Sequence, residues 1–301
     1  MELDRMEWKA ITLKDREWIS EKYRQENRKG CENCFGNNYI WRKVYGVEVT
    51  EEEGCLLSRS KGQTGIIYSM PIGNGDKKSA IERLRSESAQ RGEIFRMRNI
   101  LEADRELLLK WFGDSVGFES NRDNFDYIYT VEKLTGLSGR KLHGKRNHIA
   151  RFKEQNDWHY EPMHSENKKA CLEMAYDWKQ KNADKWNPDM ETEFEVLTQA
   201  IELFESLHFQ GGVLYVENRI VAFTVGEPLN EDTFVVHFEK AYADIQGAYP
   251  MINQQFVQHA CQSYTYVNRE EDTGAEGLRK AKLSYVPDIL LEKSMAVFAD
   301  E

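Results

Sequence analysis

Apolar and polar positions alternate along the chain with two different periods, which predict helices and short strands in turn. Apolar residues that recur every three to four positions indicate helices, whereas a period of two indicates strands. The predicted helices cover residues 14–24, 77–90, 102–112, 167–182, 194–207, 251–261 and 274–284. The predicted strands cover residues 39–45, 54–57, 64–70, 94–98, 125–129, 213–216, 219–226, 233–240, 264–268 and 289–298.

The second half has the clearest order of elements. Two helices are followed by three antiparallel strands, a helix, a strand, a helix and a last strand. This order is similar to that of the N-acyltransferase (GNAT) fold, and the first half repeats it in a weaker form. We therefore predict an α+β chain of two tandem GNAT-like domains, each a mostly antiparallel mixed sheet flanked by helices. The expected parts are a first domain over 1–135, a basic interdomain helix over 136–157 and a second domain over 158–301.

Composition narrows the classes of protein that fit. Of 301 residues, 40% are hydrophobic and 31% are charged, which favours a folded chain with a core over disorder. No apolar stretch approaches the roughly 18 residues of a membrane span, and no secretory signal is recognisable, so we expect a cytoplasmic protein. The net charge of −10 opposes general binding of polyanions, so a phosphate-rich ligand needs a local basic site.

The five cysteines favour free thiols over a disulfide framework. Cys31 and Cys34 have the spacing of half a zinc site, but no second pair of ligands follows to complete it. No two of the seven histidines lie four positions apart, and the G-x-S-x-G, G-x-x-x-x-G-K-[ST] and G-x-G-x-x-G motifs do not occur. We therefore predict no metal site and none of the usual hydrolase or nucleotide signatures.

A basic segment stands out against the acidic chain. Between Gly139 and Lys153 there are six lysines or arginines and no acid. These cations are Arg140, Lys141, Lys145, Arg146, Arg151 and Lys153. On a helix, Leu142, Ile149 and Phe152 share a face that is able to pack, which leaves the cations on the other faces. The segment fits a surface for phosphate groups, and it also fits a linker helix that pairs with the acidic body.

Polar residues of both charges gather after the predicted strand 264–268. They occupy Asn268 to Asp272, at the carboxyl end of the strand, where mixed sheets place ligands. Thr273 and Glu276 have the spacing of a capping box and predict the start of the next helix. The same residues also fit a solvated helix with a Glu276–Lys280 pair. Glu239, on the third strand of the meander, faces either water or a pocket.

Four segments resemble a known family. They are Gly-Arg-Lys-Leu-His-Gly-Lys-Arg-Asn-His-Ile-Ala-Arg-Phe (139–152), Phe-Glu-Lys-Ala (238–241), Gly-Ala-Tyr-Pro-Met-Ile-Asn-Gln-Gln-Phe (247–256) and the stretch 268–287. The sequence resembles bacterial proteins related to the C-terminal domain of phosphatidylglycerol lysyltransferase. The resemblance implies a tandem GNAT fold shared with Fem-type aminoacyltransferases, in which an aminoacyl group passes from aminoacyl-tRNA to a lipid or peptide. It also extends the expected location to peripheral contact with the inner membrane face.

The resemblance also allows a test for coenzyme A. GNAT enzymes that use this cofactor hold its pyrophosphate in a loop of the form [Q/R]-x-x-G-x-[G/A] at a helix start. Aligned on Gly247, this sequence places Asp244 at the Gln/Arg position and Tyr249 at the last small position. An acid and a bulky ring both oppose the pyrophosphate. We therefore expect no acyl-CoA cofactor and rank aminoacyl-tRNA above it as the donor.

The resemblance then suggests roles for the polar residues. Glu239 or Asp272 is expected to act as the base, and Arg269 or Arg279 to orient an anionic group or stabilise an oxyanion. The residues expected to hold donor phosphates are Arg140, Lys141, Lys145, Arg146, Arg151, Lys280 and Lys282. The residues expected to line the pocket are Asn268, Glu270, Gly247 and Tyr249. Two alternatives stay open: an acyl-CoA-dependent N-acetyltransferase with a divergent loop, and a non-catalytic binding protein on the same fold.

Overall fold

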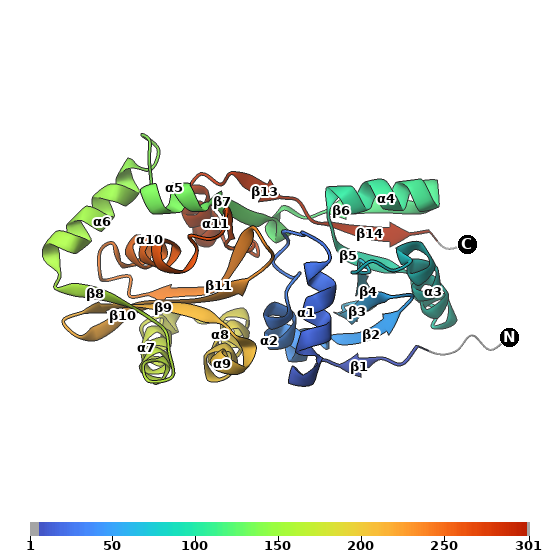
Figure 1. Ribbon diagram of the computed structural model, residues 1–301, viewed down its shortest axis with the longest axis horizontal. Helices are drawn as coiled ribbons and strands as arrows, with labels where there is room; N and C mark the ends of the chain where they lie inside the picture. The colour runs from blue at the N-terminus through green and yellow to red at the C-terminus, as the bar shows by residue number, and fades with distance from the viewer. Residues whose placement is uncertain (1–5, 300–301) are drawn as a thin grey trace. The chain divides into compact units, whose positions relative to one another are not determined.

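The structure, a computed structural model, describes residues 6–299 and divides the chain into two compact units (Figure 1). Unit 1 contains the described residues up to Asp126, then Glu271–Gly274 and the described residues from Leu290 onward. Unit 2 contains Tyr127–Glu270 and Ala275–Ile289. This division differs from the expected boundaries, because the basic segment 136–157 lies wholly within unit 2 and the C-terminal strand belongs to unit 1. No helix within residues 6–299 has the length and apolar character needed to cross a bilayer.

Unit 1 is built on a seven-stranded mixed sheet of order β1-β2-β3-β4-β5-β14-β6. Its strands are β1 (Lys9–Ala10), β2 (Glu48–Glu52), β3 (Cys55–Gly62), β4 (Gly65–Ser69), β5 (Arg96–Ile100), β6 (Val116–Ser120) and β14 (Ser294–Phe298). Its helices are α1 (Arg16–Arg24), α2 (Phe35–Tyr45), α3 (Lys77–Gln90) and α4 (Glu102–Phe112), with short 3-10 turns η1 (Leu13–Asp15), η2 (Gly113–Ser115) and η3 (Arg122–Asn124). Strands β4 and β5 pair parallel, and the other neighbouring strands pair antiparallel.

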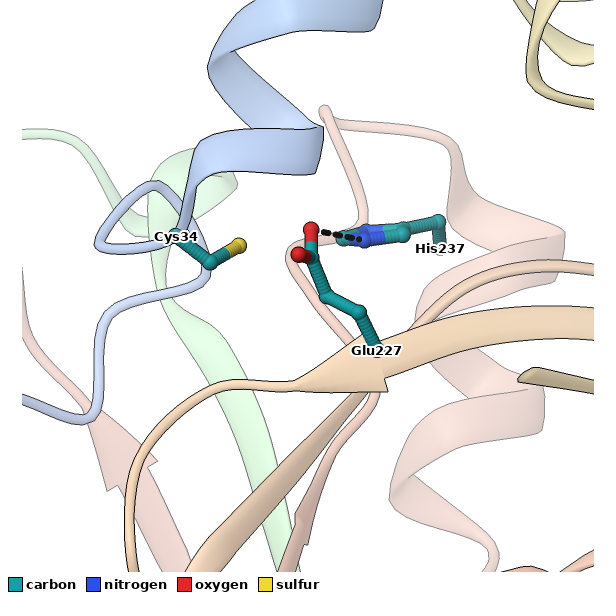
Figure 2. A group of neighbouring side chains, drawn as sticks. All are labelled: Cys34, Glu227 and His237. Carbon is teal, nitrogen blue, oxygen red and sulfur yellow. Dashed lines mark hydrogen bonds and ion pairs between the residues drawn. The ribbon is translucent and has the colours of Figure 1, made fainter. Parts of the chain in front are cut away.

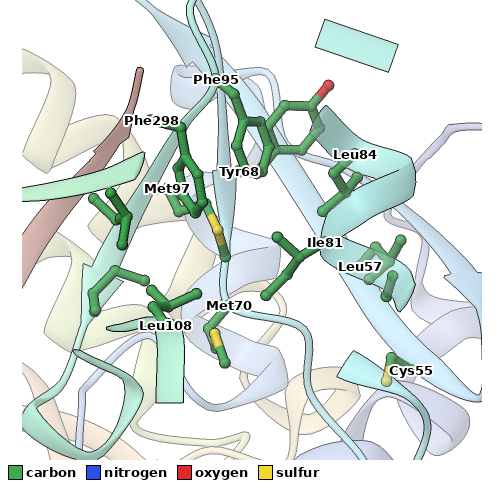
Figure 3. Close-up of a cluster of buried hydrophobic side chains, with 14 of the residues drawn as sticks. Cys55, Leu57, Tyr68, Met70, Ile81, Leu84, Phe95, Met97, Leu108 and Phe298 are labelled. Carbon is green, nitrogen blue, oxygen red and sulfur yellow. The ribbon is translucent and has the colours of Figure 1, made fainter. Parts of the chain in front are cut away.

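The core of unit 1 lies between its sheet and helices α3 and α4. Because successive side chains of a strand point to opposite faces, alternate residues enter this core. Leu57, Tyr68 and Met97 are fully buried there. Figure 3 shows them with Ile81 of α3 and Leu108 of α4. Helices α1 and α2 lie on the other side of the strands (Figure 1).

Unit 2 is built on a second seven-stranded sheet, of order β13-β7-β12-β11-β10-β9-β8. Its strands are β7 (Asp126–Thr130), β8 (Trp158–Pro162), β9 (Gln210–Val216), β10 (Arg219–Pro228), β11 (Thr233–Ala241), β12 (Tyr266–Asn268) and β13 (Ile289–Leu291). Its helices are α5 (Val131–Gly136), α6 (His143–Gln155), α7 (Lys168–Lys181), α8 (Pro188–Glu202), α9 (Phe204–Leu207), α10 (Ala248–Ala260) and α11 (Glu276–Leu283), with the 3-10 turn η4 (Ala183–Lys185). Helix α10 lies on one face of the sheet and α7 to α9 lie on the other (Figure 1).

The meander β9–β10–β11 confirms the predicted run of three antiparallel strands. Helix α10 then connects β11 to β12, and these two strands pair parallel over three residues only, Thr233–Val235 with Tyr266–Asn268. Strand β11 continues to Ala241, paired with β10 but no longer with β12. After Val235 and Asn268, where this parallel pairing ends, side chains that follow on the two segments can contact each other.

The predicted strand 39–45 is wrong, because this stretch belongs to helix α2. Its buried residues form two pairs with the helical spacing of four, Phe35 with Tyr39 and Gly36 with Ile40. Gly46 ends the helix in the left-handed region, with φ of 57°. The aromatic and β-branched residues of the stretch favoured a strand locally, and burial of one helical face overrode that preference.

Three further predictions around the basic segment and the C-terminus are corrected. The basic segment is not one helix, because Leu137 ends α5 with φ of 47° before α6 begins. The predicted strand 289–298 is split between β13 and β14, which belong to different sheets. Thr273, with φ of 50°, is not the cap of α11, whose N-cap is Ala275 without a side-chain bond. Strands β2, β6 and β8 were not predicted; each is only five residues long.

We expect Met97→Ala to destabilise unit 1 by about 2–5 kcal/mol, because the truncation leaves a cavity in a fully buried core. Urea unfolding followed by circular dichroism measures the change. The matched control is Leu109→Ala on α4. Leu109 is 48% exposed, so this change should alter stability by less than about 1 kcal/mol. Equal losses in the two variants would contradict this account of the core.

Candidate functional site

A buried ion pair bridges β11 and the residue after β12, beyond the end of their parallel pairing. Arg269 Nη2 donates to Glu239 Oε1 at 2.9 Å, with 12% and 11% of the two side chains exposed. Glu239 comes from β11, and Arg269 follows directly on β12. The carboxyl ends of parallel strands are the usual position of ligands in mixed sheets. Both residues were predicted for the site, and the structure brings them together.

Asn253 of α10 completes this group, and two of its polar atoms lack partners. Asn253 Nδ2 donates to Glu239 Oε2 at 3.0 Å, which fixes the orientation of the amide. Among the described residues, buried Asn253 Oδ1 and Arg269 Nη1 have no hydrogen-bond partner of good geometry. Buried polar atoms are almost always paired, so an acceptor and a donor left open beside one carboxylate indicate a place for a ligand. We call Glu239, Asn253 and Arg269 the polar cluster.

Aromatic rings and a lysine surround the polar cluster. The Arg269 guanidinium lies over the rings of Tyr285 and Tyr129, at 4.9 and 5.8 Å from their centroids. Burial raises the pKa of both tyrosines, against the opposing effect of Arg269. Lys145 of α6 places its Nζ 4.2 Å from the centroid of Tyr285. Burial and then the charge of Arg269 lower the pKa of Lys145, while Glu239 acts in the opposite direction.

A second buried charge group in unit 2 holds the neighbouring turn. His237 Nε2 and Glu227 Oε1 are 3.0 Å apart, and His237 Nδ1 and Glu270 Oε1 are 2.8 Å apart. Figure 2 shows the side chains of His237 and Glu227 in contact. Burial alone would lower the pKa of His237, but the two carboxylates raise it to about 9. His237 is therefore a buried imidazolium at neutral pH. It fixes Glu270, which adopts φ of 59° directly after Arg269.

The helix start that would hold a pyrophosphate in a coenzyme A enzyme is filled by protein here. Gly247 caps α10 with φ of 86°. A Cβ at this position would lie 2.4 Å from the carbonyl oxygen of His148 and 3.0 Å from Cβ of Phe152. Only glycine therefore allows α6 to approach α10 this closely. Tyr249, in the first turn of α10, is half-buried, and burial raises the pKa of its hydroxyl.

The basic segment packs against the rest of unit 2 through its apolar residues and keeps most of its cations exposed. Leu142, Ile149 and Phe152 are buried, as the helical pattern predicted. Arg146 Nη1 donates to the carbonyl oxygens of Leu137 and Gly139, so its charge closes the end of α5. The side chains that remain exposed are Arg140, Lys141, Arg151 and Lys153.

The other predicted residues occupy structural positions. Buried Asn268 accepts a hydrogen bond from the backbone N–H of Glu270. Lys282 is buried and donates to the carbonyl of Glu270, whereas Lys280 is exposed and pairs with Glu276. Arg279 is half-buried on α11.

Asp272 belongs to unit 1 and is not part of the polar cluster. Its side chain is fully buried, Oδ1 accepts from the backbone of Gly274, and Oδ2 lies 3.6 Å from Arg122. Both oxygens are thus engaged within unit 1. Of the two carboxylates predicted as the base, Glu239 is the one beside open hydrogen-bonding positions.

Cys31 lies in a buried charge cluster of unit 1 rather than in a pair of thiol ligands. Its Sγ is 3.6 Å from Asp126 Oδ1, and the ammonium of Lys293 lies 2.6 Å from the same oxygen. Burial and then Asp126 raise the pKa of the Cys31 thiol. Cys34 Sγ donates to the Cys31 carbonyl at 3.3 Å. Lys293 therefore supplies the positive charge among these acids.

Sequence reasoning missed Asn253, Tyr129, Tyr285 and His237. Asn253 lies within the quoted stretch 247–256, and a polar residue on an otherwise buried helix face was the signal available for it. The two tyrosines come from β7 and from the turn after α11, and only the tertiary fold brings them to Arg269. His237 lies within a continuous run of buried residues of β11, and its pairing with Glu227 and Glu270 is a long-range contact.

We expect the stability of unit 2 to fall as pH rises through about 9. A histidine whose pKa is raised from 6.5 to about 9 stabilises the fold fully below its unfolded value and loses that contribution above its folded value. The loss between pH 6.5 and pH 9.5 should reach about 3 kcal/mol. Urea titrations across this range should show the decline in the wild type and in His148→Gln, an exposed histidine, and a flatter profile in His237→Gln. Identical slopes in all three proteins would contradict the assignment.

Comparisons with known proteins place this chain in a family. The family described as "Phosphatidylglycerol lysyltransferase, C-terminal" matches residues 23–297. A conserved protein of unknown function from Bacteroides thetaiotaomicron has a crystal structure that is 37% identical in sequence, with a TM-score of 0.94 over 98% of this chain and 100% of that one. A curated relative, an uncharacterised protein of Mycoplasmoides gallisepticum, is 24% identical over 198 residues, and the match spans 62% of this chain and 60% of the relative.

More distant structures share the fold. The structure of L-PGS from Bacillus licheniformis is 16% identical, with a TM-score of 0.65 over 95% of this chain and 92% of that one. A tandem GNAT protein from the clavulanic acid biosynthesis pathway is 7% identical, with a TM-score of 0.50 over 99% of this chain and 100% of that one. The predicted α+β tandem GNAT fold is confirmed. The predicted resemblance is confirmed as well: the chain belongs to the phosphatidylglycerol lysyltransferase C-terminal family, a family of GNAT-fold aminoacyl-transfer domains.

Proposed function

We propose that this protein transfers an aminoacyl group from aminoacyl-tRNA to an amine or hydroxyl acceptor, and that the polar cluster of unit 2 holds the reacting ester. The observation that carries the proposal is the open donor on Arg269 and the open acceptor on Asn253, both beside Glu239. An aminoacyl ester offers the complementary pair, a carbonyl oxygen and an α-ammonium group. Family membership supports the same class of reaction.

The cluster provides the groups that acyl transfer requires. The acceptor attacks the ester carbonyl, and Arg269 Nη1 donates to the oxyanion that develops there. Glu239 takes the proton that the acceptor loses. The bond from the carbonyl carbon to the 3′ oxygen of the tRNA then breaks, and the 3′ oxygen takes up this proton. Atoms and charge balance without a metal ion or a further co-reactant.

The basic segment favours a polyanionic donor. Lys145 lies beside Tyr285, and Arg140, Lys141 and Arg151 are exposed on the same segment. Lysines and arginines on one surface bind a nucleic-acid backbone by displacing its counterions. The rest of the chain is acidic, so this segment is the place where a tRNA meets the least repulsion.

The packing of α6 against α10 argues against acyl-CoA as the donor. The carbonyl oxygen of His148 lies 2.4 Å from the position of a Cβ on Gly247, at the helix start where backbone N–H groups would have to receive a pyrophosphate. A carbonyl oxygen repels phosphate, and the space is filled. In a heat-shift titration, we therefore expect acetyl-CoA to leave the melting temperature unchanged. A saturable rise would favour the N-acetyltransferase alternative instead.

Transfer itself is tested by incubating the purified chain with tRNAs charged with labelled amino acids. Phosphatidylglycerol vesicles and a glycine-ended peptide serve as separate acceptors, and label that moves from tRNA to either is measured. The family description makes lysine and phosphatidylglycerol the first pair to test. Binding of the tRNA without transfer to any acceptor would favour a binding protein over an enzyme.

We expect Arg269→Lys to lower the transfer rate by about 10²–10³-fold, because it removes the donor aimed at the oxyanion. Arg219→Lys is the matched control, since Arg219 is an exposed arginine of unit 2 that pairs with Asp177, and it should transfer at the wild-type rate. Circular dichroism checks that both variants are folded. A fully active Arg269→Lys variant would remove Arg269 from the mechanism.

The basic surface is tested by salt dependence. The triple change of Arg140, Lys141 and Arg151 to Ala should weaken tRNA binding and reduce the slope of log K against log salt by about 2–3. A control triple change of Lys43, Lys61 and Lys110 to Ala removes the same charge from exposed positions of unit 1 and should leave the slope unchanged. Arg146 is kept in both proteins, because it closes the end of α5. Equal slopes in the two triple variants would reject the assigned surface.

A further inference from the structure

Unit 1 contains a polar cavity of its own, on the face of its sheet opposite the hydrophobic core. Ser58, Ser69 and Arg98 alternate with the core residues of β3, β4 and β5, so they point to this other face. Tyr23 of α1 and Asn38 of α2 line the same cavity. It therefore opens between the carboxyl ends of the parallel strands β4 and β5 and the two helices that cover them.

Arg98 brings a positive charge into this cavity, where the nearby carboxylate of Glu32 acts on it electrostatically without forming an ion pair. It makes no hydrogen bond or ion pair with any residue in the part of the chain that the structure describes, and its Nε is buried. Its guanidinium lies 5.6 Å from the ring centroid of Tyr45. Burial lowers the pKa of Arg98. Buried charges are normally paired, because leaving water without compensation is costly.

The cavity also holds an acceptor without a donor. Glu32 Oε1 is buried and has no hydrogen-bond partner within residues 6–299, while Oε2 lies 3.2 Å from the ammonium of Lys293. The neighbouring polar groups are satisfied by one another, since Asn38 Nδ2 donates to the Tyr23 hydroxyl at 3.1 Å. The open positions thus include one atom of a cation, Arg98 Nε, and one carboxylate oxygen, Glu32 Oε1.

Unit 2 shows what is missing at the corresponding position. In both units an arginine lies where the parallel pairing ends: Arg98 is the last residue of β5 that pairs with β4, and Arg269 directly follows the last paired residue of β12. Arg269 has the carboxylate of Glu239, from the first parallel strand. On β4 of unit 1, the residue paired with Arg98 is Ser69, which carries no charge. A carboxylate from outside the chain would supply the missing half of the pair.

We propose that this cavity of unit 1 binds the carboxylate of a small molecule through Arg98, with an ammonium group of the same molecule directed at Glu32 Oε1. A planar carboxylate fits the two-pronged guanidinium, which binds it bidentately. The cavity volume of about 20 Å³ holds about one water molecule, so only the carboxylate enters, and the rest of the ligand, with its ammonium group, stays at the mouth. An amino acid carries both groups. The inference concerns unit 1 and does not depend on the function proposed for unit 2.

The test is thermal unfolding of the full chain with glycine, acetate and glycinamide. Glycine and acetate should raise the melting temperature saturably, glycine at the lower concentration, whereas glycinamide, which has no carboxylate, should not. This comparison uses the wild-type protein and needs no variant to fold. The inference is overturned if neither carboxylate gives a saturable shift, or if glycinamide gives the same shift as glycine.

Two arginine variants make the test specific. Arg98→Met should weaken glycine binding at least about tenfold, as expected for the loss of a charged hydrogen-bonding partner. It should also raise the melting temperature of the ligand-free protein, because an apolar chain replaces a buried unpaired charge. Arg96→Met, two residues earlier on β5, is the matched control and should change neither property. Undiminished glycine binding by Arg98→Met would overturn the proposed role of Arg98.

Discussion

The parallel pairing of β11 and β12 stops after three residues, and the ion pair between Glu239 and Arg269 spans the position where it stops. Backbone hydrogen bonds hold the strands together up to Val235 and Asn268, and side-chain charges take over beyond them. The site depends on the end of this pairing, because further backbone pairing of β11 with β12 would occupy the space in which Glu239 and Arg269 meet. Asn253 of α10 and the rings of Tyr129 and Tyr285 then fix the two charges in place.

The two units use one topology with different charge balances. Each has a parallel pair of strands with an arginine at its carboxyl end. In unit 2 Arg269 forms an ion pair with Glu239 of the same unit. Its Nη1 donor is therefore available for a neutral carbonyl or a developing oxyanion. In unit 1 Arg98 forms no ion pair within residues 6–299, and Glu32 acts on it only from a distance, which favours a ligand that brings a carboxylate. The fold supplies the position, and the neighbouring residue decides which ligand fits.

Helix α6 shows how one segment combines packing with charge. Its apolar face is buried, Arg146 satisfies backbone carbonyls, and the backbone at His148 fills the start of α10. Lys145 lies over the ring of Tyr285 beside the polar cluster. The other cations of the segment, Arg140, Lys141, Arg151 and Lys153, are exposed. Lys145 and Arg146 are adjacent in sequence but lie on different faces of the helix, so one contacts Tyr285 and the other binds backbone carbonyls.

The sequence by itself determined the tandem α+β order, the helices α3 and α4, the meander β9–β11 and the choice of Glu239 and Arg269, because these follow from local periodicity, turn residues and the family's motifs. It could not determine the helical state of α2, the split of residues 289–298 between two sheets, or the partners of Arg269 and His237. Those features depend on contacts between residues far apart in the chain. Only the tertiary structure decides which buried polar groups find partners and which, such as Asn253 Oδ1 and Arg98 Nε, have no hydrogen-bond partner among residues 6–299.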